Sequence, residues 1–171
     1  MASSAQMRDV LHQACDKLAR AVRLAVIGLA VVMLVALSLQ VVMRYGFGRA
    51  LSWSEELAVT CFSWSMLLAV ALGVRDGIHV RMDLLVDRLP GALRLTLEKL
   101  VALATAFAGG FIAWSGARYV AQTGDSVSAA MAYPISWLYL CAPVGGALIA
   151  VFALEHLLAG PAPVTQPAEI A

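Results

Sequence analysis

The stretch LAVIGLAVVMLVALSLQVVM, residues 24–43, contains 20 consecutive residues without a charge. An α-helix needs about 20 apolar residues to cross the hydrocarbon core of a bilayer. Three further uncharged stretches reach or approach that length, at residues 57–74, 100–117 and 126–154. The sequence therefore predicts an all-α integral membrane protein with four transmembrane helices. We place these spans at about residues 22–44, 55–75, 96–119 and 133–157 of a membrane domain that covers residues 21–158.

The composition agrees with this class of protein. Apolar residues of the AVILMFWYC set make up 61% of the chain and charged residues 13%, and the mean hydropathy is +0.83. A soluble domain of this length needs more polar surface than that. The net charge of +1 argues against a nucleic-acid partner. The cysteines are widely spaced and follow no ligand pattern, so we expect no metal, disulfide or cofactor.

The basic residues predict the orientation of the spans. Four of the 12 Lys and Arg residues precede the first span and five lie between the second and third, whereas the other two loops hold three. Basic residues concentrate on the cytoplasmic side of a membrane. We therefore expect a protein of the bacterial inner membrane with both termini in the cytoplasm. The first apolar stretch exceeds the length of a signal-peptide core, so we interpret it as a retained anchor.

Two segments are amphipathic rather than spanning. Apolar residues recur at helical spacing between Ile78 and Leu89, which predicts a surface helix over residues 78–90 against the lipid head groups. A similar pattern predicts a cytoplasmic amphipathic arm over residues 1–20. Three prolines in residues 159–171 predict a disordered cytoplasmic tail.

Small and helix-breaking residues within the spans predict packing faces. Glycine pairs let transmembrane helices approach closely, and a proline deep in a span kinks its helix or exposes its backbone to a neighbour. The residues that we assign to helix packing on these grounds are Gly109, Gly110, Pro143, Gly145 and Gly146.

The spans hold essentially no ionisable residue, although such residues mark the pathways of many transporters. Gln40 is the strongest polar residue within a span, and we expect it to join two helices rather than to contact a substrate.

Polar residues gather instead at the outer ends of the first two spans. Ser52 and Glu55 fit a capping box, and Arg44 could form an ion pair with Glu55 or Glu56. Trp53 suits the membrane interface. These roles explain every residue, but the same group could also contact another membrane subunit. Our candidates for such a partner interface are Gln40, Arg44, Trp53, Glu55 and Glu56.

The order of these motifs resembles that of a known family. The chain carries QVVMRY at 40–45, WSEEL at 53–57, FSW at 62–64, YP at 133–134 and PVG at 143–145, in fixed positions relative to the four spans. Together they resemble the small permease subunit, or Q subunit, of tripartite ATP-independent periplasmic (TRAP) transporters.

The resemblance implies a scaffold subunit and no enzyme activity. In such systems a periplasmic solute-binding protein delivers an organic acid to a large multi-spanning permease subunit, which carries the solute with sodium ions down an ion gradient. The small subunit would then hold the static part of the large one in the lipid bilayer, and it could help to dock the binding protein.

Two alternatives stay open from the residues alone. The chain could be a stand-alone small transporter or channel, although such proteins usually place a carboxylate inside a span. It could also be a haem-binding membrane anchor of a redox complex, for which His79 and His156 are the candidate ligands. A membrane enzyme is disfavoured, because no acid–base or metal constellation is visible.

Overall fold

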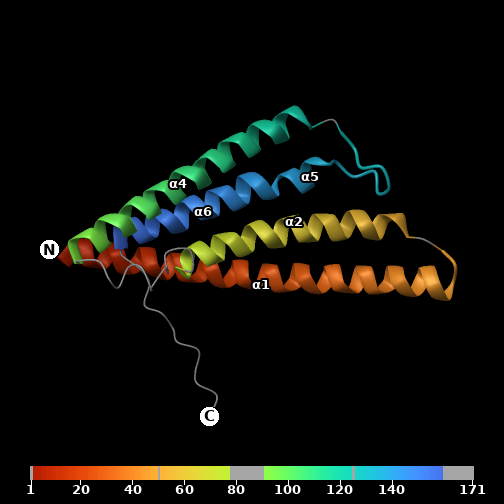
Figure 1. Ribbon diagram of the computed structural model, residues 1–171, viewed down its shortest axis with the longest axis horizontal. Coiled ribbons are helices and arrows are strands. Elements are labelled where there is room, and N and C mark those ends of the chain that lie inside the picture. Colours follow the sequence, from red (N-terminus) through yellow and green to blue (C-terminus); the bar gives the residue numbers. More distant parts are fainter. Residues whose placement is uncertain (1, 50, 78–90, 125, 160–171) are drawn as a thin grey trace, which may run out of the picture.

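Four long helices dominate the computed structural model, which describes residues 2–49, 51–77, 91–124 and 126–159. Figure 1 shows these helices lying along one long axis. All four are long and apolar enough to cross a membrane, which confirms the predicted fold class. The helices are α1 (Ala2–Gly46), α2 (Ser52–Arg75), α4 (Gly91–Gln122) and α6 (Cys141–Ala159), with a short α5 (Ser136–Tyr139) before α6.

The helices pack in a row rather than around a common interior. α1 packs on α2, α2 on α6, and α6 on α4, while α1 meets α6 only sparsely. Figure 1 shows this order, with α1 and α4 on opposite sides and the helices converging where α1 begins and α6 ends. We call this the termini end, and we call the opposite end, with residues 47–49 and 126–135, the loop end. The result is a layer whose two outer helices each keep an unpartnered face.

The buried core lies near the termini end. It contains residues of α1, α2 and α6, among them Ala19, Leu68, Ala71, Ile149 and Phe152. Phe152 and Ala71 are fully buried. Small side chains on α1 and α2 let these two helices lie close together over most of the length of α2.

Glycines bring α4 and α6 into backbone contact. A Cβ on Gly109 would lie 2.7 Å from the Ala150 nitrogen, and one on Gly146 would lie 2.5 Å from the Ala113 nitrogen. A Cβ on Gly145 would meet Leu67 of α2 at 2.8 Å, so this glycine serves the other side of α6.

Gly110 does not share this role within the described chain. A Cβ there would meet nothing within 4 Å, because neighbouring residues of a helix point about 100° apart and Gly110 turns away from α6.

The fourth span is interrupted where α5 ends and α6 begins, at Leu140. Pro143 lies in the first turn of α6, where its missing N–H leaves no helical hydrogen bond unmade. Its ring also meets α4, since a Cβ on Gly116 would lie 2.9 Å from the Pro143 Cδ atom.

The first helix is far longer than a bilayer needs. α1 has 45 residues, and at a rise of 1.5 Å per residue it measures about 68 Å, against roughly 30 Å for a bilayer core. The segment predicted as an amphipathic arm therefore continues into the first span without a break. The predicted surface helix at 78–90 and nearly all of the predicted disordered tail lie outside the described residues.

Candidate functional site

One face of α2 holds the segment that connects α4 to α6. Glu56 is the first of three α2 residues spaced four apart, which places them on one face of the helix. Its carboxylate accepts hydrogen bonds from the Ser128 hydroxyl, from the Ala130 nitrogen at 2.9 Å and from the Met131 nitrogen at 3.1 Å. A single carboxylate thus fixes a turn that lies more than 70 residues away in the sequence.

Thr60 and Trp64, the other two residues of this face, also bind the segment between α4 and α6. The hydroxyls of Thr60 and Tyr133 lie 2.9 Å apart, and the Trp64 indole donates to the Trp137 carbonyl oxygen at 3.0 Å. We call Glu56, Thr60 and Trp64 the α2 ladder. It holds residues 128–137 against α2 from the loop end into the span, and it supplies a donor to a carbonyl of the interrupted fourth helix.

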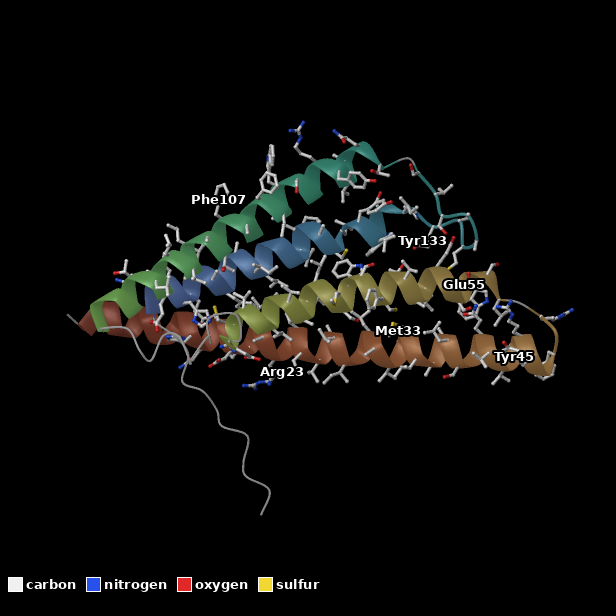
Figure 2. The ribbon with its side chains drawn as sticks, viewed as in Figure 1. Arg23, Met33, Tyr45, Glu55, Phe107 and Tyr133 are labelled. Carbon is white, nitrogen blue, oxygen red and sulfur yellow. The ribbon has the colours of Figure 1, made fainter. Side chains whose placement is uncertain are left out.

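A hollow of about 390 Å³ opens beside the ladder. Its walls are mostly apolar, with Val59, Ile135 and Leu138 among them, and Glu55 and Glu56 lie at its polar part. Figure 2 shows Glu55 and Tyr133 at the same end of the molecule, from α2 and from the segment before α5. The carboxylates would repel an organic anion, so this hollow is not suited to bind one.

The structure brings Gln40 and both glutamates of the predicted interface to the loop end. The Gln40 side-chain amide donates to the Glu55 carboxylate at 2.7 Å and so links α1 to α2. Trp53 lies half-buried in the first turn of α2. Arg44 is exposed, and the expected ion pair with Glu55 or Glu56 does not form, because Gln40 and the 128–131 turn occupy those carboxylates.

The capping box that the sequence suggested is also wrong. α2 begins at Ser52, so Leu51 is the N-cap residue and makes no side-chain cap. The Ser54 hydroxyl instead donates to the Leu51 carbonyl oxygen at 2.7 Å. The pattern of serine and glutamate three apart fits, but the helix starts one residue earlier than a Ser52 cap requires.

Sequence reasoning missed the rest of the ladder. Polar residues at positions 56, 60 and 64 share a helical spacing that could have marked a common face. Their partners between 128 and 137 could not be inferred, since only the tertiary fold brings that segment beside α2.

Replacing Glu56 with glutamine is expected to loosen this turn. Gln keeps the shape but loses the charge that strengthens three hydrogen bonds, so we expect the turn to open more often. Amide hydrogen exchange at Ala130 and Met131 should become faster. Glu55→Gln is the matched control, because Glu55 makes no bond to the turn and its variant should leave those amides unchanged.

A second polar cluster ties three helices together at the termini end. Glu155 of α6 is 4% exposed, and its carboxylate lies 2.9 Å from His12 Nδ1 of α1 and 3.6 Å from Arg75 Nε of α2. Arg75 also pairs with Asp16 of α1. We call His12, Asp16, Arg75 and Glu155 the termini cluster. No pattern in the sequence predicts this cluster, because its members lie in three distant parts of the chain and outside the uncharged cores of the spans.

His156 closes the end of α2 beside this cluster. Its Nε2 atom lies 3.0 Å from the Val74 carbonyl oxygen and 2.8 Å from that of Arg75. A donor at this position satisfies carbonyls that a helix leaves unpaired at its last turn. His156, one of the two candidate haem ligands, is thus engaged in holding α2, while His79 lies outside the described residues.

Comparison with known proteins identifies one family. The model of the family described as tripartite ATP-independent periplasmic transporters, DctQ component, matches residues 32–160. The C4-dicarboxylate TRAP transporter small permease protein DctQ of Rhodobacter capsulatus is 36% identical over 104 residues, which cover 60% of this chain and 46% of that protein. The sialic acid TRAP transporter small permease protein SiaQ of Vibrio cholerae is 26% identical over 125 residues, or 73% of this chain and 72% of that protein.

A third relative is much larger. The isethionate TRAP transporter permease protein DctMQ of Oleidesulfovibrio alaskensis is 28% identical over 107 residues, which cover 61% of this chain but 17% of that protein. This chain thus matches under half of the Rhodobacter protein and a small part of DctMQ. All three relatives are named as permease proteins of transporters, which points to a role in transport rather than in catalysis.

Proposed function

This chain belongs to the family of DctQ components of TRAP transporters, and on that premise we propose that it is the membrane scaffold that holds a large multi-spanning permease subunit in place. The large subunit carries the solute in this proposal. The small chain supplies a fixed wall against which the moving part of its partner works.

The observation that carries this proposal is the arrangement of the helices in a row. A chain that conducts a polar solute through itself needs an enclosed path lined by polar groups. Here the described residues form a layer, and their ion pairs lie at the termini end. The outer helices present exposed apolar faces, which suit lipid on one side and another membrane subunit on the other.

The partner and the cargo follow from the family and stay proposals. We propose that the chain lies in the bacterial inner membrane with both termini in the cytoplasm, which agrees with its basic residues. Its loop end then faces the periplasm, where a solute-binding protein could reach the segment held by the α2 ladder. The relatives named for C4-dicarboxylate and sialic acid support an organic acid as the solute, and we propose import driven by a sodium gradient.

Co-purification tests the scaffold role. The tagged chain, expressed with the large permease subunit of its own cell, is expected to elute with that subunit from mild detergent. Reconstituted vesicles should take up solute only when this chain, the large subunit and the binding protein are all present. A large subunit that transported at the full rate without this chain would contradict the proposal.

Glu55 offers a specific test of the predicted outer contact. Glu55→Lys reverses an exposed charge whose one hydrogen bond is to Gln40, so the chain itself should stay folded. We expect the variant to lower uptake at limiting binding protein, because it puts a positive charge where the loop end now carries a negative one. Glu56→Lys is not a fair probe, since Glu56 holds the 128–131 turn. The measurement is the uptake rate as the binding protein is titrated, with Lys17→Glu at the opposite end as control.

A further inference from the structure

The outward side of α4 carries a continuous apolar face that no described helix covers. Phe107 is 77% exposed and projects away from the other helices in Figure 2. The members of this α4 outer face follow helical spacing and lie within about 80° of one another around the helix axis. They are Leu100, Leu103, Phe107, Phe111, Trp114 and Arg118. Gly109 and Gly116, which pack on α6, lie on the opposite side of the same helix.

The exposed face of α1 differs from it in composition. Ile27, Val31 and Leu34 are typical of that face, and residues 24–43 contain no aromatic and no charged residue. Such a surface matches acyl chains. Aromatic residues and arginine are enriched at interfaces between soluble proteins, where they carry much of the binding energy, and the α4 outer face has this composition whereas the α1 face does not.

The depth of the aromatic residues also argues against lipid as their main contact. The part of α4 that is apolar enough to cross a membrane covers Thr96–Gln122, and Phe107 and Phe111 lie at the middle of this segment. Trp114 lies about 8 Å from that middle, whereas lipid-facing tryptophans gather near the interface about 15 Å away. An outward tryptophan at this depth is better suited to a protein neighbour.

Arg118 adds a charge that the described chain leaves without an anion. It is exposed, and its guanidinium lies 5.1 Å from the centre of the Trp114 ring. Arg118 lies about 14 Å from the middle of the span, at the edge of the hydrocarbon core, and its guanidinium stays over the ring of Trp114, which is one turn closer to that middle. Its described contacts include no carboxylate. A cation held at this position gains from an acceptor on a neighbouring chain.

From these observations we infer that the α4 outer face is the surface on which the large permease subunit packs, through a transmembrane helix that offers a carboxylate to Arg118. This inference rests on the proposed scaffold function. It assigns the opposite edge of the layer, the exposed face of α1, to lipid. Arg118 and Trp114 would form the centre of the contact, and Phe107 and Phe111 would extend it into the bilayer.

Site-specific photo-cross-linking tests the choice of face. A photoreactive phenylalanine analogue is placed at Phe111 on α4 or, as matched control, at Val31 on α1, in the chain co-expressed with the large subunit of its own cell. We expect an adduct of the two subunits from position 111 and at least about tenfold less from position 31. An adduct mainly from position 31, equal adducts from both, or an adduct of two copies of this chain would overturn the inference. So would cross-links to lipid alone at position 111.

The two proposals fail in different ways. If the unmodified chain does not co-purify with the large subunit, the scaffold function itself fails. If it co-purifies but the adduct forms elsewhere, only the assignment of the α4 outer face is wrong.

Arg118 is tested separately by charge and by shape. Arg118→Ala should lower the yield of co-purified large subunit about tenfold, and Arg118→Lys should restore part of it, because lysine keeps the charge but loses the planar stacking on Trp114. The thermal unfolding of the chain alone should not change, since Trp114 is the contact that the described chain gives Arg118. An unchanged yield of the complex would overturn the role assigned to Arg118.

Discussion

Replacing Arg75 with methionine is expected to lower the free energy of unfolding by about 3–5 kcal/mol, the usual effect of removing one partner from a buried ion pair. Arg75 is the cation of the termini cluster, and its side chain is 12% exposed. Without it, the Glu155 carboxylate stays buried with His12 and the neutral Cys15 thiol as its partners. Thermal or denaturant unfolding of the purified protein in detergent measures the loss.

A double variant distinguishes the effect of losing the Arg75–Glu155 pair from the effect of leaving Glu155 buried without its cation. Arg75→Met together with Glu155→Leu should recover about 2 kcal/mol or more of what Arg75→Met loses, because no buried charge is left behind. Arg23→Met is the control at an exposed pair, in which Arg23 and Asp76 are 60% and 41% exposed. That change should cost about 1 kcal/mol or less. Equal losses from Arg75→Met and Arg23→Met would contradict a special role for the termini cluster.

Adjacent glycines on α4 are expected to respond in opposite ways to the same added methyl group. Gly109→Ala should destabilise the protein by about 1–3 kcal/mol or more, because its Cβ would meet the Ala150 nitrogen at 2.7 Å and the Gly146 oxygen at 2.9 Å. These are backbone atoms, so α4 and α6 must move apart to admit it. Gly110→Ala meets nothing within 4 Å and should be neutral or stabilising by up to about 1 kcal/mol, since alanine favours a helix.

The unfolding midpoints of both variants, measured side by side, check this prediction. Each variant is the control for the other, because both replace a glycine with alanine at neighbouring positions of the same helix. A Gly109→Ala protein as stable as Gly110→Ala would show that α4 and α6 are not in backbone contact at this point.

These features fit a single mechanical role. The termini cluster and the glycine contacts fix the helices at one end and along the α4–α6 seam, and the α2 ladder fixes the connection at the other end. A subunit that serves as a static wall needs such rigidity more than it needs a polar pathway. The proposed scaffold function and the proposed α4 interface both draw on this arrangement.

Much of the local structure could be predicted, and most of the site could not. Hydropathy correctly predicted four helices that are long and apolar enough to cross a membrane, and Gln40 was correctly expected to join two helices. The predicted ion pair of Arg44 with Glu55 or Glu56 was wrong. Arg44 is near both residues in the sequence, but Gln40 and the 128–131 turn bind their carboxylates instead. Glu56 was identified as a candidate contact, yet its partners lie in the 128–131 turn, which no pattern in the sequence places beside α2.

The sequence by itself determined the class of protein and its four spans. A long uncharged hydrophobic run can be read from the local sequence alone. Within the bilayer such a run must form a helix, because no water is present to hydrogen-bond its backbone. Only the tertiary structure decided that the helices pack in a row and that Gly109, rather than Gly110, contacts another helix. It also decided which groups Glu56, Arg75 and Glu155 contact. Those outcomes depend on how helix faces rotate against one another, and lipid gives every apolar face nearly the same energy until close packing and buried charge distinguish them.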